Sequence, residues 1–336
     1  MTDSSQLTIG DVAAAAGVSV ATVSKVINDR YGVAETTSAR VRAVIDELGY
    51  TSSLVAQSLR GRRSNVVGIL VSDIEPFNAE LLKGAARAIR GTGYDLVVFS
   101  DCGQRDDQVG WERRSLARVS ALTDGAILVT PSSVEVSSSA PIVAVDHNAR
   151  SSTLPTVDSD NLSGAVTATE HLIGLGHRRS AFLAGRPDIE SARLREHGYR
   201  RALDTAGIAF DAELVRVGGY EPETAREAAR ELLMHEPRPT AIFAANDTSA
   251  IETIAVARSL GLDVPAGLSV VGFDNVPESA LCEPPLTTID QSIQGMGEEA
   301  VRMLLGLIED PSNRPAQVVL PTRLVERGSC APVESA

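Results

Sequence analysis

In the first fifty residues, hydrophobic positions recur at the spacing of short helices. The first apolar face, at i, i+3, i+4 and i+7, consists of Ile9, Val12, Ala13 and Ala16. Gly17 follows, where a helix end favours a left-handed residue, and Ser19 can cap a second helix. The apolar face of that second helix consists of Val23, Val26 and Ile27. Two helices joined by a tight glycine turn are typical of a helix-turn-helix, although a helical hairpin in a larger core has the same spacing.

A third helix is predicted to end at Gly49. Either Thr36 or Thr37 can cap its start. Its buried stripe consists of Val41, Val44, Ile45 and Leu48. Three short helices make a small but viable domain, so residues 1–50 are predicted to form a separate headpiece.

From residue 66 the pattern changes to short, continuous apolar runs with helical patterns between them. The first series of runs occupies 66–71, 94–99, 125–129 and 141–145. The second series occupies 180–184, 213–217, 240–245 and 268–273. Buried strands that alternate with helices are typical of a doubly wound parallel α/β sheet. Two series predict two similar lobes with a cleft between them.

The charge is distributed unevenly between these two regions. The whole chain of 336 residues carries a net charge of −13. Residues 1–65 hold seven basic and six acidic side chains, whereas the rest holds 24 basic and 38 acidic ones. Only the N-terminal segment is therefore suited to approach the phosphates of a nucleic acid.

The sequence also predicts a cytoplasmic protein without a membrane span. No apolar run reaches about 18 residues, and the opening stretch MTDSSQLT is polar and acidic rather than typical of a secretory signal. The three cysteines, Cys102, Cys282 and Cys330, are odd in number and far apart, which favours reduced thiols over a disulfide framework.

Motifs along nearly the whole chain resemble one family in order and in content. The N-terminal motifs are LTIGDVAAAAGVSVATVSKVIND, ARVRAVIDELGY and SLVAQSLRGRRSNVVGIL. The later ones are TEHLIGLGHRR, ARLREHGYRRAL, AIFAANDTSAI, LSVVGFDNVPESALCEPPLTTI and VVLPTRLVERGS. Together they resemble the lactose repressor/galactose repressor family of bacterial transcription regulators. The resemblance implies that residues 20–28 form the recognition helix of a helix-turn-helix.

Positions in that helix differ in what they can offer to DNA. The resemblance places Val20, Ala21 and Lys25 against base edges. Val20 and Ala21 can make apolar contact with a thymine methyl, and Lys25 can donate to guanine or to phosphate. The positions expected to contact phosphate or to cap the helix are Thr22, Ser24 and Asn28.

Residues 51–64 match the family's hinge helix, which orders on DNA. Leu59 then corresponds to a leucine that wedges into the minor groove and kinks the duplex, and Ala56 is small where the helix approaches the groove floor. Arg60, with Arg62 and Arg63, would neutralise phosphates. Without the resemblance, the same stretch is a weak polar helix or a flexible linker.

For residues 65–336 the resemblance implies a two-lobed, periplasmic-binding-protein-like domain that binds an effector and dimerises. The first lobe is expected at about 65–159 and 291–320, and the second at about 160–290 and 321–330. The chain should cross between the lobes near Asp158–Asn161, Thr288–Gln291 and Leu320–Thr322. Ligands of such sheets bind beyond the carboxyl ends of the strands.

Polar residues follow several of the predicted strands, and the resemblance makes them effector contacts. The expected contacts are Asp73, Phe77, Asp146, Arg195, Tyr220, Asn246 and Asp274. Helix caps and hydrogen bonds between the lobes are the alternative roles for the polar ones. Two positions depart from sugar-binding members: Glu75 replaces an asparagine, and Ile293 replaces an aromatic residue.

These residues favour a neutral polyol such as a sugar, since polar groups can bind hydroxyls while rings cover the sugar face. A purine, a nucleoside or another metabolite acting as co-repressor is the alternative, and aromatic residues, at 4%, are few for purine stacking. A sugar-binding transport protein shares the fold but not residues 7–63. No phosphate-binding loop or metal-ligand spacing is present, so no catalysis, cofactor or metal is expected. The chain is thus predicted to be an allosteric repressor of carbohydrate-utilisation genes.

A homodimer is predicted, because two headpieces are needed on a roughly palindromic operator. The C-terminal stretch LVERGSCAPVESA lacks the leucine heptads that would build a tetramer. The resemblance assigns pairing to residues 278–289 and to the helix starting near Phe77. Cys282 would then be a buried interface thiol.

Overall fold

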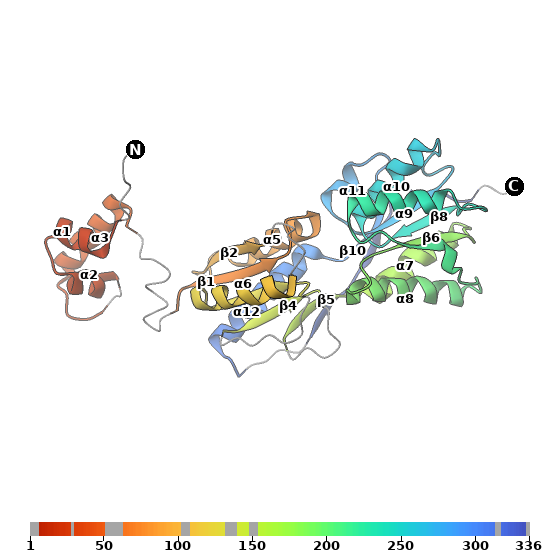
Figure 1. The fold of residues 1–336 in the computed structure, drawn as a ribbon. Helices are drawn as coiled ribbons and strands as arrows, with labels where there is room; N and C mark the ends of the chain where they lie inside the picture. Colours follow the sequence, from red (N-terminus) through yellow and green to blue (C-terminus); the bar gives the residue numbers. More distant parts are fainter. Residues whose placement is uncertain are drawn as a thin grey trace. The chain divides into compact units, whose positions relative to one another are not determined.

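The computed structural model describes residues 7–27, 30–50, 63–101, 108–131, 140–147, 154–312 and 317–333. The chain divides into two compact units, Met1–Ser64 and Asn65–Ala336 (Figure 1). Each unit has its own hydrophobic core.

The first unit holds three helices, α1 (Ile9–Ala16), α2 (Val20–Ile27) and α3 (Glu35–Leu48). Gly17 ends α1 with φ 61°, as the left-handed turn requires, and the Ser19 hydroxyl accepts the Thr22 N–H at 3.1 Å to cap α2. The buried core consists of Val12, Ala13, Ala16, Val23, Val26 and Val41. The predicted helix-turn-helix and third helix are both present.

The start of α3 differs from the prediction. The helix begins at Glu35, after an extended Ala34 that supplies no side-chain cap, so neither Thr36 nor Thr37 caps it. The Glu35 carboxylate lies in the first turn, where it interacts favourably with the helix dipole.

No single helix in the described ranges is long and apolar enough to cross a membrane. The pair α1 and α2 passes that test together by length and composition, but the two helices are bent by 104° at their break.

The second unit contains two six-stranded sheets. The first sheet has the order β11-β5-β4-β3-β1-β2, and all its neighbouring strands are parallel. Its strands are β1 (Val66–Val71), β2 (Asp95–Ser100), β3 (Gly125–Val129), β4 (Ile142–Val145), β5 (Thr156–Ser159) and β11 (Val318–Leu320).

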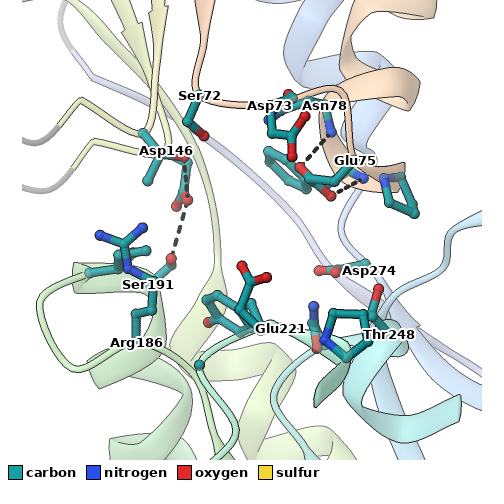
Figure 2. Close-up of a pocket in the computed structure, with 18 of the residues that line it drawn as sticks. Ser72, Asp73, Glu75, Asn78, Asp146, Arg186, Ser191, Glu221, Thr248 and Asp274 are labelled. Atoms are coloured by element: carbon teal, nitrogen blue, oxygen red, sulfur yellow. Dashed lines mark hydrogen bonds between the residues drawn. The ribbon is translucent and has the colours of Figure 1, made fainter. Parts of the chain in front are cut away.

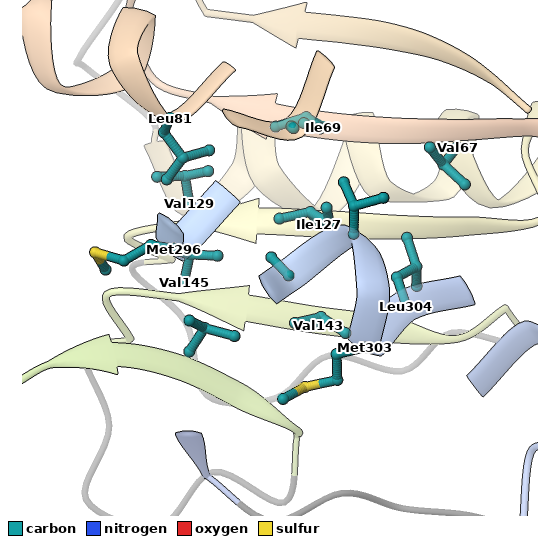
Figure 3. Close-up of a cluster of buried hydrophobic side chains, with 14 of the residues drawn as sticks. Val67, Ile69, Leu81, Ile127, Val129, Val143, Val145, Met296, Met303 and Leu304 are labelled. Atoms are coloured by element: carbon teal, nitrogen blue, oxygen red, sulfur yellow. The ribbon is translucent and has the colours of Figure 1, made fainter. Parts of the chain in front are cut away.

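Helices cover both faces of this first sheet. Val67, Ile69 and Val71 of β1 pack against α5 (Pro76–Ala88) and α12 (Ile293–Glu309), in the core shown in Figure 3. Leu70 points to the opposite face, where α6 (Gln108–Leu122) covers the sheet. The strand is buried on both sides, which explains its continuous apolar sequence.

Glycines let α5 and α12 approach backbone to backbone. A Cβ on Gly84 would lie 1.9 Å from the Gln294 carbonyl oxygen, and one on Gly297 would lie 2.2 Å from the Leu81 carbonyl oxygen. No larger residue fits at either position without moving a helix.

The second sheet has the order β12-β10-β9-β8-β6-β7, and only the β10–β12 pair is antiparallel. Its strands are β6 (Ser180–Ala184), β7 (Val215–Val217), β8 (Ala241–Ala244), β9 (Ser269–Asp274), β10 (Thr287–Asp290) and β12 (Arg323–Val325). Helices α7 (Asn161–Gly174) and α8 (Glu190–Thr205) pack on one face, and α9 (Pro222–Leu233) and α10 (Asp247–Ser259) on the other. Two short helices, Ala212–Leu214 and α11 (Pro277–Leu281), complete the unit.

The chain passes between the two sheets three times. The passages join β5 to α7, β10 to α12 and β11 to β12. Strand β10 continues to Asp290, where it pairs with both β9 and β12, so the second passage begins at Gln291, within the predicted range Thr288–Gln291. The carboxyl ends of both sets of parallel strands therefore face a common space between the lobes.

Candidate functional site

A cavity of about 350 Å³ lies between the two lobes, at the carboxyl ends of both sheets (Figure 2). All seven side chains predicted to contact an effector line it: Asp73, Phe77, Asp146, Arg195, Tyr220, Asn246 and Asp274. They come from segments spread over two hundred residues of sequence. The position agrees with the rule that ligands of open α/β sheets bind beyond the strand ends.

Arg195 is the most buried charged group of this cavity, with 4% of its surface exposed. Its Nε donates to Asn161 Oδ1 at 2.9 Å, and its Nη1 donates to the Ala245 carbonyl oxygen. The guanidinium also lies 3.8 Å from the centroid of the Phe273 ring, as in a cation–π contact. These contacts fix the arginine in one position before any ligand binds.

Asp274 and Gln291 complete the network around Arg195. Asp274 Oδ1 accepts from Arg195 Nη1 at 3.3 Å and from Gln291 Nε2. Gln291 Oε1 in turn accepts from Arg195 Nη2 at 3.3 Å and from the Ser159 hydroxyl at 2.7 Å. Burial raises the pKa of Asp274, although the positive charge of Arg195 opposes that shift.

Gln291 is a residue that the sequence prediction missed. It lies in the second passage between the lobes, is 1% exposed, and touches Ser159 in the first passage. Its amide thus connects two interlobe passages to the Arg195–Asp274 pair. Its position directly after the strand β10 is the signal that could have identified it, just as Asn246 was identified two residues after β8.

Asp146 connects the two lobes directly. Its Oδ2 accepts from Thr130 Oγ1 at 3.2 Å in the first lobe and from Ser191 Oγ at 3.3 Å in α8 of the second. Figure 2 shows this link across the left side of the cavity. Burial raises the pKa of Asp146, against the effect of Arg195. Ser191 lines the cavity and was not among the predicted contacts, whereas Gln291 lies behind the lining residues Arg195 and Asp274.

Tyr220 lies opposite the first lobe, and its ring occupies the space that a side chain at position 185 would need. A Cβ on Gly185 would lie 2.1 Å from Tyr220 Cζ. The Tyr220 hydroxyl is buried and has no hydrogen-bond partner in the structure. Burial also raises the pKa of the phenol, so the hydroxyl keeps its proton.

The first lobe contributes the start of α5. The Glu75 carboxylate accepts the N–H of Phe77 at 2.7 Å and that of Asn78 at 3.0 Å, which caps the helix. Asn78 donates to the Asp73 carbonyl oxygen at 2.9 Å, whereas its own Oδ1 is buried without a partner. Glu75 and Asn78 both line the cavity and were not among the predicted contacts.

Asn246 caps a helix, which is one of the two roles that the sequence left open, and it also lines the cavity. Its Oδ1 accepts the Ser249 N–H at 2.9 Å and caps α10, and the same residue lines the cavity.

Strained backbone gathers at this cavity. Four of the described non-glycine residues with positive φ line it: Thr130 (45°), Asp146 (51°), Tyr220 (69°) and Asp274 (119°). Such conformations cost on the order of 1–3 kcal/mol each and cluster at binding sites. Here each one lies at or near the end of a strand or loop that faces the cavity.

In the first unit, α2 has one buried face and one exposed face. Val23 and Val26 are buried, whereas Val20 (47% exposed), Ala21 and Lys25 are exposed, as a base-reading face requires. Thr22 and Ser24 are half-buried, and the Thr22 hydroxyl lies 2.9 Å from that of Ser19. The other predicted DNA contacts, Asn28, Ala56, Leu59 and Arg60, lie outside the described residues.

Comparisons with known proteins match both units of the chain. Residues 8–53 match the family described as bacterial regulatory proteins, lacI family, and residues 169–330 match the periplasmic binding protein-like domain. The ribose operon repressor of Escherichia coli (strain K12) is 33% identical over 330 residues, which cover 96% of this chain and 99% of the repressor.

Two solved structures are similar over the full length. The complex of the transcriptional regulator CelR with cellobiose is 32% identical, with a TM-score of 0.71 over 96% of this chain and 99% of that one. The lac repressor dimer bound to operator and the anti-inducer ONPF is 28% identical, with a TM-score of 0.83 over 97% of this chain and 100% of that one.

Proposed function

The chain belongs to the lacI family of bacterial regulatory proteins, and from that premise we propose that it is a repressor of carbohydrate-utilisation genes whose operator affinity is controlled by a sugar. It is a DNA-binding transcriptional regulator with an effector-binding domain. The observation that carries the proposal is the convergence of all seven predicted contact residues on one cavity between the lobes. Two of the relatives named above are repressors and the third is a transcriptional regulator, and we propose that this chain likewise regulates rather than catalyses.

A sugar is proposed because of the cavity and the relatives together. The cavity combines aromatic rings with carboxylate and amide groups, which suits a polyol. Its volume of about 350 Å³ is at the small end of ligand pockets, which run from about 300 to 1,000 Å³. One similar structure holds cellobiose, and one relative represses a ribose operon.

The proposed mechanism follows from the separation of the two units. Two chains pair through residues 65–336 and place two copies of α2 on a roughly palindromic operator. A sugar that favours a closed cleft shifts the lobes relative to each other. Residues 51–64 of the two chains then no longer pair with each other on the DNA, and operator affinity falls. The coupling is reciprocal and typically worth about 1–3 kcal/mol, so operator DNA must weaken sugar binding by the same factor. Operator binding would place the protein with the bacterial chromosome in the cytoplasm.

A thermal-shift screen of the purified full chain against ribose, glucose, galactose and cellobiose tests the effector. A specific sugar at 100 times its Kd should stabilise the protein by roughly 2.7 kcal/mol. The same sugar should then weaken binding to an operator obtained by selection from random DNA. Stabilisation by nucleobases and not by any sugar would contradict the proposal.

The variant Asp274→Asn separates the two sites. It keeps the shape of a side chain that lines the cavity and removes its charge, so the response to the sugar should be lost. Operator affinity without sugar should stay near the wild-type value, because the cavity and α2 are in separate units. A matched control is Asp211→Asn, since Asp211 pairs with Arg179 outside the cavity. Normal sugar affinity in Asp274→Asn, measured by calorimetric titration, would place the site elsewhere.

The hinge part of the proposal is tested through Leu59. The variant Leu59→Ala should weaken specific operator binding and reduce the bend in the DNA, because a wedge that unstacks a base step is lost. An unchanged affinity and bend angle in a gel-shift assay would contradict the assignment of residues 51–64.

A further inference from the structure

We propose that the cleft selects an uncharged sugar and excludes the phosphate esters and acids of sugars. The inference rests on the proposed function, because it narrows the chemical class of the same effector. It follows from three observations: the charge of the cavity walls, the state of its two arginines, and the group that occupies the start of α5.

Carboxylates dominate the described walls of the cavity. They are Asp73, Glu75, Asp146, Glu221 and Asp274, against two arginines, Arg186 and Arg195. In Figure 2 the Glu221 carboxylate points from the second lobe towards the side that carries Asp73 and Glu75. Burial raises the pKa of Glu75, Asp146 and Asp274. An anionic ligand would still add negative charge to walls that hold more carboxyl groups than guanidinium groups, in a partly dehydrated space where charges are screened less than at a surface.

Both arginines are already bound to acceptors of the protein. Arg186 forms a bidentate pair with Asp188, with Nε–Oδ1 and Nη2–Oδ2 distances of 3.2 and 2.6 Å. Arg195 donates to acceptors on four residues: Asn161, Ala245, Asp274 and Gln291. A guanidinium can bind a phosphate, but here a phosphate would have to compete with these acceptors.

The start of α5 carries an anion of its own. The N-terminus of a helix is a ready site for phosphate, since its free N–H groups and its dipole favour negative charge. Here the Glu75 carboxylate accepts the N–H groups of Phe77 and Asn78 at 2.7 and 3.0 Å. Glu75 therefore occupies the position where a phosphate group would bind in a 13-residue helix that faces the cavity.

The same walls offer groups that a neutral sugar can satisfy. Two buried polar atoms of the cavity have no partner, Asn78 Oδ1 and the Tyr220 hydroxyl. Asn78 is only 5% exposed and lies at the wall of the cavity. Buried polar atoms are normally hydrogen-bonded, which points to a ligand that donates to Asn78 and pairs with Tyr220. Sugar hydroxyls do both, and they can also donate to the surrounding carboxylates.

Matched pairs of ligands test the inference on the full-length protein. The panel consists of ribose and ribose 5-phosphate, glucose and glucose 6-phosphate, gluconate, and inorganic phosphate alone. Because like charges that face each other at an interface oppose binding, a phosphate ester should bind at least about 100-fold more weakly than its parent sugar in calorimetric titration. Inorganic phosphate at millimolar concentration should leave the Tm unchanged.

The variant Glu75→Gln tests the origin of the selectivity. The variant keeps an oxygen that can accept a backbone N–H but removes the charge. The ratio of the Kd of the ester to the Kd of its parent sugar should therefore fall about tenfold. A matched control is Asp160→Asn, because Asp160 also caps a helix, accepting the Ser163 N–H at 3.0 Å, but does not line the cavity. The control should keep the wild-type selectivity.

Each outcome decides the question. An ester or gluconate that binds as tightly as a free sugar, or stabilisation of the wild type by inorganic phosphate, would overturn the inference. If Glu75→Gln keeps the wild-type ratio of ester Kd to sugar Kd, Glu75 is not the cause of the selectivity. If neither a sugar nor its phosphate ester binds, the proposed function fails and the selectivity fails with it, whereas an ester that binds when its parent sugar does not would overturn this inference alone.

Discussion

At the scale of single residues, Asp247 shows how a buried charge next to the cleft can affect stability. It directly follows Asn246, is fully buried, and accepts the Val276 N–H at 2.9 Å and the Thr288 hydroxyl. Burial raises the pKa of Asp247 to about 7, and these two hydrogen bonds only partly oppose the shift. The folded protein therefore keeps this proton to a higher pH than the unfolded chain does.

The consequence is a testable dependence of stability on pH. Between about pH 4 and pH 7 the folded state binds more protons than the unfolded state, so the free energy of unfolding should fall as the pH rises. The variant Asp247→Asn should lack this pH-dependent part of the free energy of unfolding. Because the pKa differs by about three between the folded and unfolded states, that part is at most about 4 kcal/mol. Urea unfolding at several pH values checks the prediction. Parallel pH profiles for the two proteins would show that Asp247 does not cause the dependence.

Lys25 is the residue that we expect to read a base. It is exposed on α2, on the same face as Val20 and Ala21. The variant Lys25→Ala should lose about 1–3 kcal/mol of operator affinity and relax the preference at one position in each half-site. Competition binding with operators mutated at single positions measures both effects. An equal loss for all sequences would make Lys25 a phosphate contact instead.

At the scale of elements, the contact between α5 and α12 depends on the absence of side chains. Gly84 and Gly297 each face backbone of the other helix, whereas a Cβ on Gly306, also in α12, would meet no atom within 4 Å. Because α12 begins directly after the second passage between the lobes, this contact also fixes where that passage enters the first lobe.

Two alanine variants in the same helix should therefore have opposite effects. Gly306→Ala should stabilise the protein by about 0.5–1 kcal/mol, since alanine loses less entropy in a helix than glycine. Gly297→Ala should destabilise it by about 1–3 kcal/mol or more, because its Cβ would overlap the Leu81 carbonyl oxygen. Denaturant unfolding measures both values. Similar values for the two variants would show that the helices are not in tight contact.

At the scale of the whole molecule, the segment predicted to form the dimer carries an exposed hydrophobic residue. Leu281, on α11, is 83% exposed in the single chain. The neighbouring Cys282 is half-buried, and its thiol lies 3.2 Å from the Pro284 carbonyl oxygen. Burial raises the pKa of the Cys282 thiol, which lowers its reactivity even before any pairing.

We expect a two-fold dimer at micromolar concentration, with or without DNA. The variant Leu281→Asp should shift sedimentation equilibrium towards monomer, because a charge would be buried in the interface. Met234→Asp is a matched control, since Met234 is 67% exposed after α9 and outside the predicted interface. A stable tetramer, or an unchanged dimer in Leu281→Asp, would contradict the assignment. Rapid labelling of Cys282 by a thiol reagent in the intact dimer would show that this thiol is not buried in the interface.

The sequence by itself determined the elements and the places where polar residues follow them. Helical and strand periodicity are local properties, so the helix-turn-helix, the two series of strands and the strand-end positions Asp146, Asn246 and Asp274 could be predicted. The start of α3 was placed too late because a threonine is a good cap wherever it stands, whereas the actual start is set by the extended backbone of Ala34.

Only the tertiary structure decided which groups remain available to a ligand. The hydrogen-bond partners of Arg195 cannot be predicted from local sequence, because they lie 34, 50, 79 and 96 residues away from it. Gln291 meets Ser159 across 132 residues. Hydrogen bonds of this kind form only when separate strands end at the same edge, so the sequence could place a cation at the cleft but could not show that acceptors of the protein already occupy it.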